Sequence, residues 1–352
     1  MKLETLLPLG KVDPGLREPV APFDLQTIGR ESHKAEELGY DSIMFEETKF
    51  DPYVVMALAA NATRNVGIGT AVAIAFPRSP AVTAMSAWTL QSLSGGRFIL
   101  GLGTQVRAHI ERRYGLKWSP AGPWMREYVL AVKEIWRAWQ SSEQPDFSGQ
   151  HYSINLTVPL FDPGPIDTPD IPIHLAAVNS YMCEVAGEVS EGLRPHPVCT
   201  AEYIKNVMWP AVHRGAGKSS RSIKDFSMSI KPLIATAPDE ESLQGKIRDI
   251  RARVAFYAST PAYRAAFEAH GLESLADELK LLSRAQRWEE MPSRISDDVL
   301  NQYACVGTYD NIVAILKDRY ADIVTNVEFS IPVNTPEDGD ILRGMISELR
   351  ST

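Results

Sequence analysis

Eight short apolar runs, spread along the chain, constrain its fold more than any other feature. Each run but the last is separated from the next by sequence of helical character, and strands that alternate with helices in this way form a parallel sheet. Eight parallel strands close into a barrel. We therefore predict an α/β fold, a TIM (β/α)8 barrel. The runs are centred on Leu3, Ile43, Ile68, Ile99, Ile173, Leu193, Ile230 and Val327.

Length and composition fit one large domain. The chain has 352 residues, 44% of them hydrophobic and 23% charged, so a single barrel domain over residues 1–352 is expected. The stretch from about 238 to 300 is helical, rich in charge and too long for one barrel helix, which predicts a helical insertion that covers the barrel mouth. A strand over 226–236, a hairpin over 150–158 and a loop over 14–22 are also expected.

Charge and cysteine content exclude several classes of protein. A net charge of −8 argues against a nucleic-acid-binding or anionic-membrane surface, so small molecules are the expected partners. No apolar run approaches the ~18 residues that a membrane helix needs. Cys183, Cys199 and Cys305 have neither disulfide nor metal-site spacing, which predicts no metal centre and a reducing compartment, the cytoplasm.

The stretch over 94–105 is predicted to form a turn, a strand and a ligand-binding loop. The strand follows paired glycines, and the loop opens with Gly101 and Gly103. Loops at the carboxyl ends of parallel strands hold ligands, and glycine lets the backbone approach a flat or anionic group. Gly103, Thr104 and Gln105 are therefore site candidates. The alternative is that the two glycines only relieve crowding in the barrel wall.

Ionisable residues at other strand ends are candidates for proton transfer. Glu46 and Glu47 follow the second strand, and since adjacent side chains point to opposite sides, at most one faces the central cavity. His109 follows the ligand loop, and histidine is a common general acid or base. His196, between two prolines, either serves the substrate side or hydrogen-bonds a loop carbonyl. Lys231 either meets an acidic substrate group or is a paired core lysine.

A helix begins directly after the fifth strand. The apolar strand over 171–177 runs into Val178, Asn179 and Ser180, and Asn179 or Ser180 can cap the helix. Free backbone N–H groups at such a helix start bind phosphate readily. Capping of the helix alone is the alternative.

Two segments, Pro52–Ala60 and Ala81–Leu93, are apolar on every helical face. One barrel surface cannot cover a helix of this kind, so a second copy of the chain is expected to bury the far side and form a homodimer. A charged replacement such as Ala59→Glu is expected to break this dimer, because a buried, unpaired carboxylate is strongly unfavourable.

Motifs across the barrel also resemble the bacterial-luciferase-like superfamily. They are Gly39-Tyr40-Asp41, Gly67-Ile68-Gly69-Thr70, Ser94-Gly95-Gly96-Arg97, Gly101-Leu102-Gly103 and Leu175-Ala176-Ala177. A further set is similar to an actinobacterial branch that uses the deazaflavin coenzyme F420. This set comprises Gly103–Val106, His109–Arg113 and Met125–Tyr128.

The resemblance implies where a cofactor binds. A flavin or deazaflavin ring would lie against a bulge that maps to Ala71 and Val72, which in the deazaflavin enzymes holds a non-prolyl cis peptide. By the same resemblance, Gly103, Thr104 and Gln105 would line the cofactor. Its phosphate would be held by Ala177, Val178, Asn179 and Ser180.

The resemblance implies an oxidoreductase that transfers a hydride between coenzyme F420 and a small organic substrate. Where a deazaflavin sugar-phosphate dehydrogenase of the family has Asp-His, this chain has Glu47-Thr48, and Gln105 stands in place of a Glu. Its proton-transfer machinery is therefore different, with Glu47, His109 and His196 as the catalytic candidates. The alternatives are an FMN-dependent monooxygenase and a non-catalytic flavin-binding barrel.

Overall fold

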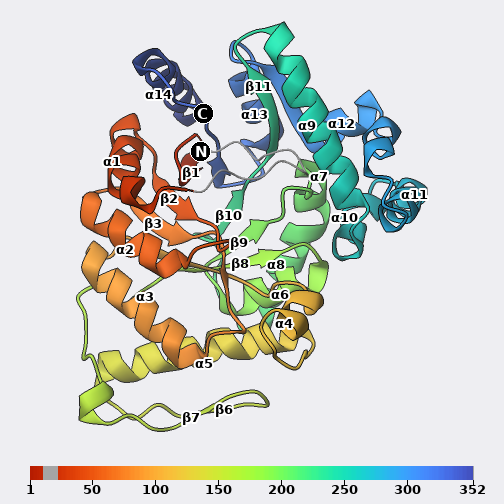
Figure 1. Cartoon of the computed structure of the whole chain (residues 1–352). Coiled ribbons are helices and arrows are strands. Elements are labelled where there is room, and N and C mark those ends of the chain that lie inside the picture. Colours follow the sequence, from red (N-terminus) through yellow and green to blue (C-terminus); the bar gives the residue numbers. More distant parts are fainter. Residues whose placement is uncertain (11–22, 352) are drawn as a thin grey trace.

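A computed structural model describes residues 1–10 and 23–351, so the loop expected over 14–22 lies outside the described residues. Eight parallel strands form a closed barrel, which confirms the predicted fold class (Figure 1). The strand order is β3-β2-β1-β13-β10-β9-β8-β5, and pairing of β3 with β5 closes the ring. These strands are β1 (Lys2–Leu6), β2 (Ser42–Phe45), β3 (Gly67–Thr70), β5 (Phe98–Gly103), β8 (Ile173–Ala177), β9 (Gly192–Pro195), β10 (Ser227–Ile230) and β13 (Asn326–Glu328). The short β4 (Ala73–Ile74) continues the third strand beside β5.

Helices between the strands surround the barrel, and short polar side chains fix where they begin. Asp51 caps α2, Ser79 caps α3 and Asn179 caps α6, each by accepting hydrogen bonds from backbone N–H groups of the first turn. Gly39 follows the last residue of α1 and ends the helix with a left-handed φ of 93°. The barrel helices are α1 (Ile28–Leu38), α2 (Pro52–Ala62), α3 (Pro80–Ser94), α5 (Ala121–Ser141), α6 (Ser180–Val189), α8 (Trp209–Lys218), α13 (Ile312–Tyr320) and α14 (Pro336–Arg350).

The single strand that was expected over 226–236 is two strands in the structure. The first, β10, ends before Lys231 and Pro232, because proline has no N–H to donate to a neighbouring strand. The second is β11 (Leu233–Ala237), which pairs in parallel with β12 (Ala304–Thr308), a strand that the sequence did not predict. Helices then occupy most of 240–303, and Figure 1 shows them on the side of the barrel away from α3 and α5. They are α9 (Glu240–Ala258), α10 (Arg264–Glu268), α11 (Glu273–Arg284) and α12 (Asp297–Tyr303); with β11 and β12 we call them the appendage.

The predicted hairpin is present but begins earlier than position 150. β6 (Phe147–Ser148) pairs antiparallel with β7 (Ser153–Ile154). The N–H of Gly149 donates to the carbonyl of Tyr152 at 2.8 Å and closes the turn. In the described part of the chain, no helix is long and apolar enough to cross a membrane.

A buried polar cluster lies inside the barrel. Glu4 of β1 forms an ion pair with Arg194 of β9 and accepts a hydrogen bond from Asn326 at 2.9 Å. Burial opposes the charged form of Glu4, but Arg194 and Asn326 more than offset it, so its pKa is lowered. Burial, followed by the positive charge of Arg194, lowers the pKa of the nearby His174 to about 4. The interior of the barrel around Glu4 is therefore filled by hydrogen-bonded polar side chains and is not a pore.

Candidate active site at the carboxyl face of the barrel

The residues predicted to bind a cofactor lie on neighbouring strands. β4, β5 and β8 are adjacent in the barrel wall, so their carboxyl ends meet. Ala71 and Val72 lie between β3 and β4, and the peptide bond between them is cis. The remaining candidates are Gly103, Thr104 and Gln105 at the end of β5, and Ala177, Val178, Asn179 and Ser180, which run from the last residue of β8 to the first residue of α6. Their contact with a cofactor stays a prediction.

Close packing explains the two glycines of the ligand loop. A Cβ on Gly101 would lie 1.9 Å from the carbonyl oxygen of Thr70, and a Cβ on Gly103 would lie 2.6 Å from Cγ2 of Val72. The Thr70 hydroxyl donates to the Gly101 carbonyl at 2.6 Å and accepts from its N–H at 2.9 Å. Relief of crowding, the alternative to a ligand contact, is therefore sufficient reason for both glycines.

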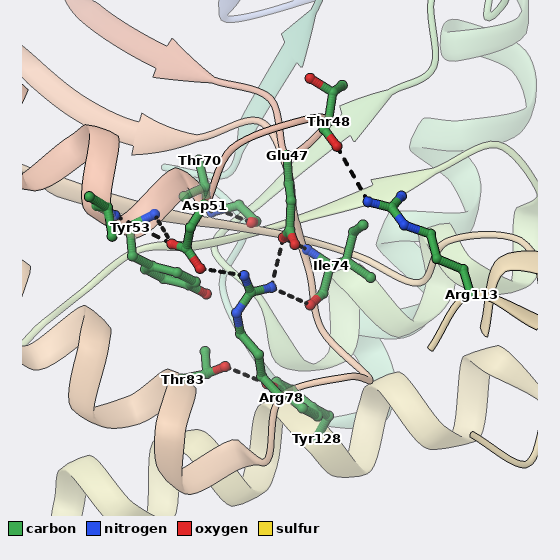
Figure 2. Close-up of polar contacts among 12 residues, drawn as sticks. Glu47, Thr48, Asp51, Tyr53, Thr70, Ile74, Arg78, Thr83, Arg113 and Tyr128 are labelled. Atoms are coloured by element: carbon green, nitrogen blue, oxygen red, sulfur yellow. Dashed lines mark hydrogen bonds and ion pairs between the residues drawn. The ribbon is translucent and has the colours of Figure 1, made fainter. Parts of the chain in front are cut away.

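Glu47 is the centre of a polar network at the end of β2 (Figure 2). Its Oε2 accepts hydrogen bonds from the backbone N–H of Ile74 and from Nη1 of Arg78, both at 2.7 Å. Nη2 of Arg78 donates to Asp51 at 2.8 Å, and Asp51 also caps α2. The side chains of Glu47 and Arg78 are 11% and 18% exposed, so water screens their ion pair weakly. The network holds β2, β4 and α2 in a fixed arrangement.

Glu46, the adjacent carboxylate, pairs with a different part of the barrel. Nζ of Lys231 donates to Oε1 of Glu46 at 3.0 Å and lies 3.8 Å from Oε1 of Glu328. Lys231 is therefore a paired lysine, the second of the two alternatives. The two carboxylates serve separate networks, as the alternation of side chains along a strand predicts.

The loop after β5 lies close to the end of β2. Gln105 has a positive φ of 57°, and its Oε1 accepts from the backbone N–H of Val106 at 2.8 Å. α4 (Arg107–Arg112) follows, and the side chain of His109 on this helix is exposed. Arg113 donates to the carbonyl of Thr48 at 3.4 Å (Figure 2). His109 and Glu47 thus come from two segments that meet at one side of the mouth.

His196 is held as a neutral ring. Its Nδ1 accepts a hydrogen bond from the backbone N–H of Val198 at 3.3 Å, rather than donating to a loop carbonyl. The ring stacks on Tyr263 with centroids 4.0 Å apart and meets the edge of Tyr257 at 4.8 Å. Burial, followed by the charge of Lys231, lowers the pKa of His196 to about 3. Nε2 therefore carries the proton and is a hydrogen-bond donor at neutral pH.

The start of α6 has a donor set that suits an anion. Oδ1 of Asn179 accepts from the N–H of Met182 at 2.9 Å, so the predicted cap is present. Ser180 Oγ accepts from Nη2 of Arg214 on α8 at 2.9 Å. The first N–H groups of a helix have no partner within it. Arg214 places a positive charge beside them, and its Nε also pairs with Oε2 of Glu184 at 3.4 Å. These residues fit the phosphate of a flavin or deazaflavin.

Sequence reasoning missed two arginines that organise the mouth. Arg78 lies in the loop before α3, and its partner Glu47 is 31 residues away. A charged residue between an apolar stretch and the Ser-Pro start of a helix could have identified it. Arg214, on the face of a different helix, leaves no comparable signal near Asn179. In the described residues, no group of His, Cys, Asp and Glu side chains has the arrangement of a metal site.

Comparison with known proteins identifies the family of the chain. The luciferase-like monooxygenase family matches residues 2–326, so the chain belongs to this family of oxidoreductases. An uncharacterized Mycobacterium tuberculosis protein is 36% identical over 90% of this chain and 92% of its own length. The F420-dependent glucose-6-phosphate dehydrogenase of Amycolatopsis mediterranei is 27% identical over 78% of this chain and 83% of its own. The coenzyme F420-dependent tetrahydromethanopterin reductase of Methanopyrus kandleri has the same fold, with a TM-score of 0.75, 19% identity and coverage of 99% of this chain and 98% of that one.

Proposed function

We propose that the protein is a coenzyme F420-dependent oxidoreductase that transfers a hydride between the deazaflavin and a small organic substrate at the carboxyl face of the barrel. The observation that carries this proposal is the donor set at the start of α6. This helix follows β8, the strand that pairs with β5. A relative named for its dependence on F420 supports the choice of cofactor. When bound, the deazaflavin supplies the hydride chemistry, and the protein supplies binding and orientation.

Each part of the mouth has its own role in this proposal. The backbone N–H groups at the start of α6, with Arg214, bind the cofactor phosphate. The Glu47–Arg78 pair fixes the β4 segment against which the ring lies. His196 donates a hydrogen bond from Nε2 toward the substrate side. Glu47 and His109 remain the candidates for holding the proton that accompanies hydride transfer at an alcohol or carbonyl carbon.

Matched cofactor pairs test the phosphate role. FMN and riboflavin differ only in the phosphate. F420 and its chromophore differ in the phosphate and in the tail that the phosphate carries. We expect the phosphate-bearing member of the preferred pair to bind at least about tenfold more tightly, because charge-assisted hydrogen bonds contribute on the order of 2 kcal/mol. Arg214→Gln should reduce this preference in a fluorescence titration. An unchanged preference would place the phosphate elsewhere.

An FMN-dependent monooxygenase is the second candidate, and the family match favours it specifically, because the family is described as monooxygenase. A monooxygenase uses a reduced flavin to place one oxygen atom of dioxygen in the substrate and the other in water. Protein-dependent incorporation of labelled oxygen into an organic substrate, beyond the reaction of free reduced FMN, would therefore support it. A non-catalytic flavin-binding barrel is the third. The polar groups of the mouth, Glu47, Gln105, His109 and His196, disfavour it, because a binding barrel does not need so many.

A further inference from the structure

A cavity of about 370 Å³ lies at the carboxyl face of the barrel, between the barrel and the appendage. Its barrel side comes from the ends of three strands, β1, β10 and β13, and from the residues that follow them. Its appendage side comes from β11 and from one face of α9. The barrel contributes Thr5, Leu6, Lys231, Glu328 and Phe329, and the appendage contributes Leu233, Thr236, Ser242, Lys246, Asp249 and Ile250.

The strand order places this cavity opposite the proposed cofactor residues. In a ring of eight strands, β1 lies across from β8, β13 from β5, and β10 from β3. The cavity therefore occupies the half of the mouth that the cofactor candidates leave open. Lys231 connects the two halves, since it lines the cavity, pairs with Glu46 and contributes to the lowered pKa of His196.

Most charged groups around the cavity already have partners. Glu328 lies 3.8 Å from Lys231, and Asp338 accepts hydrogen bonds from the backbone at the start of α14. Asp249 is exposed on the rim. Lys246 differs from them: it is half-buried, and within residues 1–10 and 23–351 its ammonium group has no hydrogen bond or ion pair.

A second polar atom is also left without a partner. Oγ1 of Thr236 is buried, and no described residue bonds to it. Leu6, Leu233, Ile250 and Phe329 form an apolar part of the wall, and the rest of the lining is polar or charged. The volume lies within the 300–1,000 Å³ that is typical of small-molecule pockets, and the apolar part of the wall can contact the apolar part of a ligand. A partly buried ammonium is stabilised when an anionic group of a ligand reaches it.

We infer that this cavity is the substrate side of the active site and selects a small apolar acid, whose carboxylate pairs with Lys246 and accepts from Thr236. The inference rests on the proposed function for its assignment to the substrate. The apolar body of such an acid would lie along Leu6, Leu233 and Phe329. The acid group would then be held on the appendage, with the rest of the molecule directed toward the centre of the mouth.

Calorimetric titration of the whole protein with octanoate and octanamide tests this inference, because the two probes differ mainly in charge. We expect octanoate to bind about tenfold or more tightly than octanamide. Lys246→Gln should remove that preference, and Lys246→Arg should retain much of it. Thr236→Val should weaken octanoate less. Lys224→Gln, at an exposed position before β10, is the matched control and should change nothing.

Equal binding of the two probes, or a preference that survives in folded Lys246→Gln, would overturn the inference. A preference lost equally in Lys224→Gln would also overturn it, because it would reflect net charge alone. Titration of the same samples with F420 and FMN separates this outcome from the proposed function. If neither cofactor binds while Lys246 still selects octanoate, the cavity assignment stands as an acid site and the oxidoreductase proposal fails.

Discussion

At the end of β2, one side chain joins three elements. Glu47 accepts from the backbone beside β4 and from Arg78, which in turn bonds the residue that caps α2. A carboxylate with these partners can act in two ways. It can hold a proton for the reaction, or it can position, through Arg78, the segment at which we propose that the cofactor binds. The two roles predict different responses to substitution.

If Glu47 is the acid or base, Glu47→Gln should lower the single-turnover rate with bound cofactor by about 10² or more, with cofactor affinity little changed. If it only positions the segment, Glu47→Gln and Arg78→Gln should lower cofactor affinity and the free energy of unfolding by similar amounts. Stopped-flow kinetics and urea unfolding measure both quantities. Normal turnover in Glu47→Gln beside an inactive His109→Ala would transfer the proton role to His109.

Gly103 supports a second prediction at this scale. A methyl group at position 103 would meet Cγ2 of Val72, so Gly103→Ala should destabilise the protein and disturb the segment between β3 and β4. Val72→Ala removes the opposing methyl group and should restore much of the loss in the double variant. Urea unfolding of all four proteins gives the coupling energy. If the two effects add without coupling, packing against Val72 is not the reason for this glycine.

At the scale of elements, α2 and α3 carry an apolar outer surface. Val54 and Leu58 on α2 are 63% and 47% exposed, and Val82 and Met85 on α3 are 45% and 56% exposed. Ala59, in contrast, is fully buried in the core of the chain. The expectation that Ala59→Glu tests a dimer is therefore wrong, because that change would disrupt the fold itself. The proposed homodimer is tested at Leu58 instead.

Leu58→Glu should convert a dimer into a folded monomer, because it places a charge in the apolar contact while the core stays intact. Light scattering reports the mass, and far-UV circular dichroism confirms the fold. Leu281→Glu on α11, where the side chain is 66% exposed, is the control and should leave the mass unchanged. A wild-type monomer at micromolar concentration would remove the dimer proposal.

The elements also show how far the sequence could predict the structure. The eight barrel strands could be predicted because each is a local apolar run, and most of them are followed by a helix with its own start signal. β12 could not be predicted, since Ala304–Thr308 is rich in small residues and pairs with β11, a strand of the appendage. The pairing of Glu47 with Arg78 and the cavity around Lys246 depend on segments far apart in the chain, so no local spacing reveals them.

At the scale of the whole molecule, the buried polar cluster makes stability depend on pH. The pKa of His174 in the folded state is about 4, below its ordinary value of 6.5, because burial and Arg194 disfavour the protonated ring. The unfolded chain therefore binds more protons between these two values. The contribution of His174 to stability is complete above pH 6.5 and is lost as the pH falls toward 4. The lowered pKa of Glu4 acts in the same direction at lower pH.

We predict that the free energy of unfolding falls between pH 6.5 and 4.5, with a slope that His174 steepens by at most about 1.4 kcal/mol per pH unit. His174→Gln should flatten this part of the profile, whatever its effect on stability at pH 7. Urea unfolding at four pH values in this interval measures the slope. An identical slope in the two proteins would show that His174 does not titrate on unfolding.

Titration of the purified protein with coenzyme F420 and with FMN, followed by cofactor fluorescence, tests the proposed cofactor most directly. Both carry a phosphate, which we propose binds at the start of α6, so the comparison isolates recognition of the ring and of the remaining tail. We predict saturable binding of F420 at micromolar concentration or below and clearly weaker binding of FMN. Tight binding of FMN without binding of F420 would contradict the proposed cofactor.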